Sequence, residues 1–249
     1  WGDEFNELYV MYENEGKFRK QVSAKSLWEK VINSQIETGS PYILYKDSVN
    51  RKSNQKHYGM IKSSNLCTEI VEYSDSKETP VCNLASLCLP SYINENNEIN
   101  YELLGDKTRE LVKNLNNIID INSYPTEESR VSNMRHRPIG IGVQGFADVL
   151  MKMKISYDSE CAREINKCVF ECIYYNALIE SNNMAKEFGS YETFEGSPTS
   201  NGILQFDLWG VTPQFIDLER TTLATEGIYV LNCPRAVLPT NLWRFITAE

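Results

Sequence analysis

Ser63-Ser64-Asn65-Leu66-Cys67-Thr68-Glu69-Ile70 is the stretch around which the rest of the chain is organised. It carries an amide, a thiol and a carboxylate at alternate positions, in Asn65, Cys67 and Glu69. In an extended segment alternate side chains point to the same side, so these three groups are predicted to share one face. A polar face opposite a more apolar one is typical of a segment held over a cavity.

The carboxylate beside Cys67 restricts the chemistry of the thiol. A nearby negative charge disfavours a thiolate, and no histidine is closer in sequence than His57. If Cys67 reacts, it is therefore expected to react as a neutral S–H group or as a radical. The alternative is simple packing, because free cysteines are often buried. Cys82 lies in the string Val81–Ser86, and this second thiol favours chemistry over packing.

Composition and charge exclude several classes of function. The chain has 249 residues and is 41% hydrophobic, enough for one sizeable core or two small ones. Its net charge of −9 leaves no broad basic surface for nucleic acid or for an anionic membrane. No apolar run reaches the roughly 18 residues that a spanning helix needs, and the start of the chain has no signal-peptide pattern.

The cysteines indicate a reducing compartment. There are seven, scattered and without a Cys-x-x-Cys pair, so a cytoplasmic location is expected. Cys161, Cys168 and Cys172 share one helical stripe, but no fourth ligand stands at zinc-like spacing. We therefore expect core packing there and no bound metal.

Hydrophobic periodicity and turn residues predict a mixed α/β chain. Helices are expected at 5–15, 26–38, 104–119, 146–153 and 161–188. Short strands are expected at 42–45, 70–73, 138–143 and 202–208, and a polar loop at 47–57.

A glycine-rich stretch, Pro138–Gly145, matches the G-x-G-x-x-G pattern of dinucleotide-binding proteins through Gly140, Gly142 and Gly145. That pattern needs a buried strand before the first glycine, and the charged string Arg135–Pro138 occupies this place. A nicotinamide-dependent dehydrogenase is therefore kept only as an alternative, and a tightly packed core strand is favoured.

Several strings together resemble the large, catalytic subunit of class I ribonucleoside-diphosphate reductases of the eukaryotic and viral type. They are Glu37–Tyr42, Leu44–Ser48, Asn50–Gln55, Ser64–Tyr73, Val81–Ser86, Arg135–Gly145 and Tyr191–Pro198. The resemblance is nearly continuous from Trp1 to about Pro213.

The resemblance implies an α/β fold that is part of a ten-stranded barrel, built from two antiparallel halves with a finger loop through the centre. The stretch Ser63–Ile70 would be that finger. Cys67 would form the thiyl radical that takes the 3′ hydrogen of a ribonucleoside diphosphate. Glu69 would accept the proton of the 3′ hydroxyl, and Asn65 would orient the ribose. Cys82 would be one half of the dithiol that supplies electrons when the 2′ hydroxyl leaves as water.

The implied partners follow from this chemistry. They are the ribonucleoside diphosphate, a small subunit whose metal centre generates the radical, a second large subunit, and thioredoxin or glutaredoxin as reductant. The chain itself is expected to bind no cofactor, no metal, no nucleic acid and no membrane.

Residues 1–213 are assigned to the barrel domain, and residues 214–249 to a divergent tail without a recognisable match. Members of the family are far longer, so the chain is expected to be a fragment. The second dithiol cysteine and the tyrosine pair of the radical relay are expected outside it, and the isolated chain is expected to be inactive. The alternative is a catalytically inactive remnant or binding module derived from such a subunit.

Overall fold

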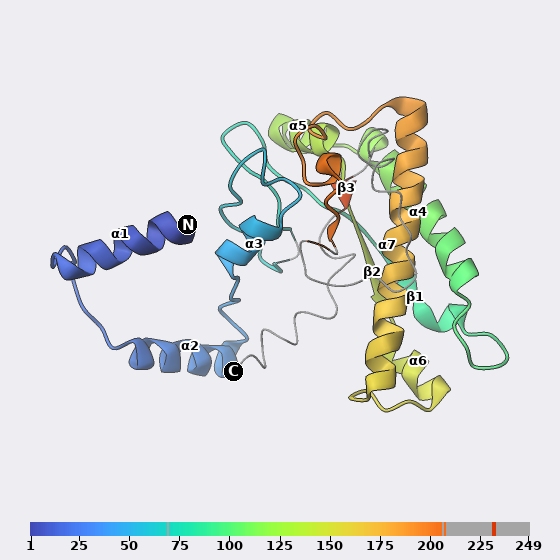
Figure 1. Ribbon diagram of the computed structural model, residues 1–249, viewed down its shortest axis with the longest axis horizontal. Helices are drawn as coiled ribbons and strands as arrows, with labels where there is room; N and C mark the ends of the chain where they lie inside the picture. The colour runs from blue at the N-terminus through green and yellow to red at the C-terminus, as the bar shows by residue number, and fades with distance from the viewer. Residues whose placement is uncertain (69, 206, 208–230, 233–249) are drawn as a thin grey trace.

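Two parallel strands, β1 (Asn83–Cys88) and β2 (Pro138–Gln144), form the centre of the computed structural model of the protein (Figure 1). A short third strand, β3 (Leu231–Asn232), pairs with β2 in parallel. The structure describes residues 1–68, 70–205, 207 and 231–232. The chain is thus α/β as expected, whereas the partial ten-stranded barrel and its central finger stay predictions.

Strand β2 is apolar along most of its length because it is covered on both faces. Its first four residues, from Pro138 to Ile141, are all buried, as is usual in a parallel sheet. Gly140 and Gly142 lie inside this strand, and Gly145 precedes the next helix. A dinucleotide fingerprint instead places its glycines in the turn after the strand. The dehydrogenase alternative is therefore wrong, and the expected core strand is confirmed.

Helices connect β1 to β2, since parallel neighbours need a crossover. The connection contains the 3₁₀ turn η1 (Leu89–Tyr92), α4 (Tyr101–Ile121) and α5 (Glu127–His136). The Asn100 side chain caps α4 by accepting a hydrogen bond from the backbone N–H of Leu103. The buried stripe of α4 repeats every three or four residues, which confirms the helix expected at 104–119.

Two further helices complete the layer around the sheet. They are α6 (Phe146–Met153) and the long α7 (Glu160–Phe188), which ends at Gly189 as expected. Helix α7 packs along α4 (Figure 1). A single apolar cluster joins the strands to these helices and to the segment after α7. Its members include Leu87, Leu104, Val112, Ile139, Ile141, Val149, Val169, Ile173, Tyr191, Phe194 and Leu204.

The first two helices, α1 (Gly2–Asn14) and α2 (Ala24–Thr38), bury no side chain and lie apart from the α4–α7 pair (Figure 1). Their apolar faces carry exposed aromatic residues such as Phe5 and Trp28. Both helices were expected. The cap of α2 is Ser23, whose side chain accepts from the Ser26 N–H, so the predicted start at Ser26 is wrong.

Other expected elements are absent from the described residues. The loop predicted at 47–57 contains α3 (Lys46–Lys52), and no strand forms at 42–45, 70–73 or the described part of 202–208. That last region instead begins after a 3₁₀ turn, η2 (Thr199–Asn201). None of the helices in the described part of the chain is long and apolar enough to traverse a bilayer.

Candidate functional site

Cys67 lies on a closed turn rather than on an extended segment. The Asn65 side chain accepts a hydrogen bond from the Ile70 N–H at 3.1 Å, and the Ser64 hydroxyl donates to the Ile70 carbonyl at 2.6 Å. The Thr68 N–H also donates to the Asn65 carbonyl. The predicted alternation along Ser63–Ile70 is therefore wrong, because these local bonds take the place of a strand ladder.

The predicted site residues have different environments. Cys67 is exposed on the turn, and Asn65 is half-buried and engaged in closing it. Glu69 lies outside the described residues. Cys82 is half-buried and lies directly before β1. The structure thus brings Asn65 and Cys67 into one small loop, and the catalytic roles of Asn65, Cys67, Glu69 and Cys82 stay predictions.

Backbone strain marks the residue after Cys67. Thr68 has a φ of 62°, in the left-handed region that a β-branched residue rarely adopts. Strain of this kind costs about 1–3 kcal/mol and persists where surrounding contacts over-determine the conformation. The closed turn described above supplies such contacts.

Residues 55–61 lead into the Cys67 turn and form the first limb of this loop. A buried side-chain amide anchors this limb. The side chain of Asn50, on α3, accepts from the Ile61 N–H at 2.7 Å and donates to the Ile61 carbonyl at 3.0 Å. It satisfies both backbone groups of Ile61, as a neighbouring strand would do. Asn50 and Ile61 are each only 2% exposed, so these bonds are sheltered from water.

Residues 70–78 follow the Cys67 turn and form the second limb, which packs directly against the first. The Gln55 side chain accepts from the Tyr73 N–H at 2.8 Å, and the rings of Tyr58 and Tyr73 meet edge to face with centroids 4.7 Å apart. Gly59 leaves room for the Tyr73 ring, which any side chain at that position would strike. The two limbs that flank the Cys67 turn are therefore held together by a hydrogen bond and a ring contact.

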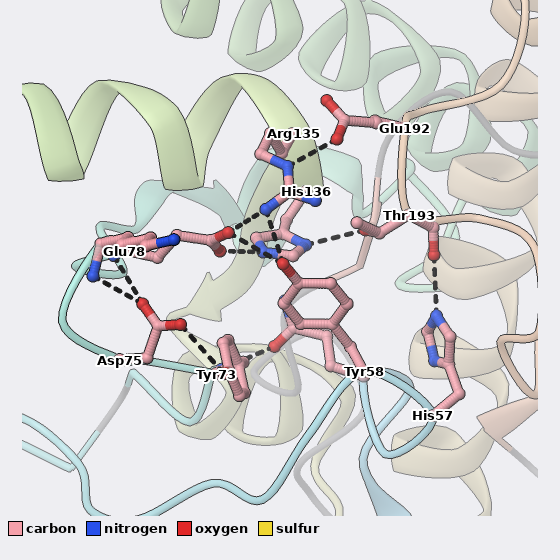
Figure 2. A network of polar contacts seen from close by, with 11 residues as sticks. His57, Tyr58, Tyr73, Asp75, Glu78, Arg135, His136, Glu192 and Thr193 are labelled. Atoms are coloured by element: carbon pink, nitrogen blue, oxygen red, sulfur yellow. Dashed lines mark hydrogen bonds and ion pairs between the residues drawn. The ribbon is translucent and has the colours of Figure 1, made fainter.

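A buried carboxylate, Glu78, ends the second limb and forms the centre of a polar network (Figure 2). It accepts from His136 Nε2 at 2.6 Å and from the Tyr58 hydroxyl at 3.0 Å, and it pairs with the Arg135 guanidinium. Arg135 also bonds the exposed Glu192 at 2.6 Å. These three partners of Glu78 thus lie 20, 57 and 58 residues away from it in the sequence.

The histidine of this network is expected to be neutral at pH 7. Burial lowers the pKa of His136 below its ordinary value, in spite of the hydrogen bond and charge of Glu78. Arg135 already balances the Glu78 charge. Burial opposes the charged form of Arg135, but its bonds to Glu192 and Tyr58 keep its pKa above the ordinary value. In the matching tautomer, assigned from these partners, Nε2–H donates to Glu78.

Both histidines of the chain converge on Thr193. His136 Nδ1 lies 2.8 Å from the Thr193 hydroxyl, and His57 Nε2 lies 2.9 Å from its carbonyl oxygen (Figure 2). His57 belongs to the first limb, His136 ends α5, and Thr193 follows α7. The network therefore joins three segments that are distant in sequence.

The cysteines within the described residues form no group that could hold a metal ion. Across the described ranges, no three His, Cys, Asp or Glu side chains are placed to hold a metal ion together. Burial raises the pKa of Cys172 to about 11, so this thiol stays protonated at neutral pH. The expected core packing of the stripe holds only in part, because Cys161 is exposed and Cys168 and Cys172 are half-buried.

Sequence reasoning did not identify the Glu78 network. Arg135 and His136 stand in a charged string that carries part of the family resemblance but no predicted role, and Glu78 lies in a polar turn. A usable signal was the rarity of histidine, since the chain has only two.

Comparison with known proteins completes the description of the chain. The family model described as "Ribonucleotide reductase, barrel domain" matches residues 1–241. That match passes the boundary expected at Pro213, and the division there stays a prediction; most of the expected tail lies outside the described residues.

Curated relatives agree with this match. The chain is 56% identical to a ribonucleoside-diphosphate reductase large subunit of Caenorhabditis elegans over 213 residues, 86% of this chain and 27% of that protein. It is 51% identical to a large chain of Cryptosporidium parvum over 92% of this chain and 29% of that protein. A large subunit of Variola virus is 51% identical over 86% of this chain and 28% of its own length. The chain thus spans less than a third of these relatives.

Proposed function

The chain belongs to the ribonucleotide reductase barrel-domain family, and on that premise we propose that it contributes the radical-bearing loop of a ribonucleoside-diphosphate reductase large subunit. The reaction is the reduction of a ribonucleoside diphosphate to the deoxyribonucleoside diphosphate. The observation that carries this proposal is the closed turn with Cys67 exposed on it. An exposed thiol on a loop tied down at both ends is suited to reach a bound ribose.

Each predicted site residue has a role in the proposed reaction. Cys67, as a thiyl radical, takes the 3′ hydrogen of the ribose, and Glu69 accepts the proton of the 3′ hydroxyl. Asn65 orients the sugar. Cys82 supplies electrons as one half of a dithiol when the 2′ hydroxyl leaves as water. A disulfide forms in this step, and thioredoxin or glutaredoxin reduces it again.

The proposal includes partners that the chemistry needs. A small subunit with a metal centre supplies the radical, and a second large subunit completes the assembly. A cytoplasmic location stays a prediction.

A graft tests the proposal. The 213 aligned residues of the C. elegans large subunit are replaced by those of this chain, and conversion of CDP to dCDP is measured with small subunit and thioredoxin. The graft is expected to be active, and Cys67→Ser is expected to abolish turnover. Cys88→Ser is the matched control, because Cys88 is also an exposed free thiol but lies on β1. An active Cys67→Ser graft would refute the proposal.

A second proposal concerns the 249-residue chain on its own. We expect it to be inactive, as the alternative of a remnant or binding module requires, because α1 and α2 bury no side chain. Exposed apolar faces of this kind favour association over a working site. Production of dCDP by the isolated chain, with small subunit and reductant, would contradict this expectation.

A further inference from the structure

Glu78 joins both limbs of the Cys67 loop to the rest of the fold. The first limb runs from Gln55 to Ile61 and contains Tyr58, and the second runs from Ile70 to Glu78. The Glu78 carboxylate accepts from Tyr58 across the two limbs, and from Arg135 and His136 at the end of α5. A single side chain therefore connects the two limbs to each other and to a helix.

The backbone beside Glu78 is fixed as firmly as its side chain. Asp75 accepts from the Lys77 N–H at 2.7 Å and from the Glu78 N–H at 2.9 Å, which closes a tight turn. The next N–H, of Thr79, donates to the Glu128 carbonyl in the first turn of α5. The carboxylate thus reaches the C-terminal end of α5 while the backbone contacts its N-terminal end.

We infer that Glu78 is a positioning residue, which clamps the base of the Cys67 loop onto α5 and so fixes where the Cys67 thiol stands. The inference rests on the proposed function, because it assigns Glu78 a part in that reaction. Glu78 does not touch the turn that carries Cys67, and it acts through Tyr58, Tyr73 and the limbs. Side chains on helices hold a site more exactly than loops do. Charge-assisted bonds in a buried setting are also the stronger kind.

The inference is tested first on the full 249-residue chain by hydrogen–deuterium exchange. Glu78→Gln keeps the shape of the side chain and removes its charge. The amides of Ile61, Ile70 and Tyr73 report on the loop, because each donates to a side-chain acceptor. They are expected to exchange about tenfold faster, the factor given by loss of one charge-assisted hydrogen bond. Amides in α4 are expected to keep their rates.

Glu180→Gln is the matched control. Glu180 is a similarly buried carboxylate, 5% exposed against 2% for Glu78, and it pairs with Lys113 on the α4–α7 side. It makes the same chemical change without touching the loop. Unchanged loop exchange in Glu78→Gln, or the same acceleration in Glu180→Gln, would overturn the inference.

Activity of the graft supplies a second measurement that general destabilisation would not reproduce. Glu78→Gln is expected to lower kcat about tenfold or more, with KM for CDP within about twofold, because a misplaced thiol slows chemistry more than binding. Glu180→Gln is expected to keep both values. An unchanged kcat in Glu78→Gln would overturn the positioning role. If Cys67→Ser stays active while Glu78→Gln still loosens the loop, the clamp stands and the proposed reaction fails.

Discussion

Replacing Asn50 with alanine is expected to destabilise the folded chain by about 2–6 kcal/mol. The Asn50 side chain is 2% exposed and satisfies both backbone groups of Ile61, which is equally buried. Alanine would leave the Ile61 N–H and carbonyl buried without these partners. Each unsatisfied buried group costs about 1–3 kcal/mol, which gives the range.

Loop entropy is too small to account for such a loss. If Ile61 is released, the segment between anchors grows from 12 residues, up to Tyr73, to 18 residues, from Gln55 to Tyr73. This lengthening changes the closure free energy by only about 0.4 kcal/mol. The desolvated backbone of Ile61 therefore dominates the effect. Asn50→Asp distinguishes loop entropy from the loss of hydrogen bonds to Ile61. It keeps an acceptor for the Ile61 N–H but turns a carboxylate oxygen toward the Ile61 carbonyl. It is therefore expected to destabilise the chain as much as Asn50→Ala does.

Urea unfolding followed by far-ultraviolet circular dichroism of the helices measures the change. The midpoint is expected to fall at an unchanged m-value, as for a loss of stability without a change in exposed surface. Asn201→Ala is the control, because the exposed Asn201 amide also donates to a carbonyl, that of Ser197. It is expected to cost less than about 0.5 kcal/mol. A free energy of unfolding for Asn50→Ala within about 0.5 kcal/mol of the parent would refute the reasoning.

Two further predictions concern the packing after β2 and the buried histidine. Gly145→Ala is expected to cost about 2–5 kcal/mol in thermal or urea unfolding, because φ is 76° and the new Cβ would lie 2.6 Å from the Pro90 ring. Gly39→Ala, with φ of 73° in the same left-handed region but in open space, is expected to cost only about 1–2 kcal/mol, and equal losses would contradict the packing argument. The lowered pKa of His136 means that the unfolded chain binds its proton first, so stability is full above about pH 6.5 and falls as pH drops below it, by at most about 1.4 kcal/mol per unit. His136→Gln is expected to flatten this slope between about pH 7 and 5.5, and an unchanged slope would show that another group titrates there.

The elements that sequence analysis predicted correctly are those whose pattern is local. Helix α4 has a buried residue at nearly every third or fourth position, and an asparagine cap stands directly before it. Strand β2 is a continuous apolar run. In both elements, the apolar residues that become buried follow a regular pattern within the element's own sequence.

Helix α5 was missed because its buried face is polar. The residues that it buries are Ser129, Ser132, Asn133 and His136, so no apolar stripe marks it. Two of them have partners elsewhere in the chain: the Asn133 amide donates to the Tyr124 hydroxyl, and His136 bonds Glu78. Hydrophobic periodicity cannot detect a helix stabilised in this way.

The strand predicted at 70–73 failed for a related reason. Alternating side chains share a face only while a neighbouring strand holds the backbone extended. Here the Tyr73 N–H is taken by the Gln55 side chain, and the Ile70 N–H by Asn65. These backbone N–H groups are therefore not available to pair with a neighbouring strand, and the chain reverses direction at Thr68.

Because the predicted alternation is wrong, the position of the Cys67 thiol depends on residues other than its immediate neighbours. A strand would fix the thiol through its own backbone ladder, and the surrounding string would then be sufficient to define the site. A closed turn is fixed at its base, by Asn50 on one limb and Glu78 on the other. Both lie outside Ser63–Ile70, and the Glu78 partner His136 is 58 residues further along the chain. The string thus contains the proposed reacting group, whereas the position of that group depends on buried polar contacts that only the folded chain brings together.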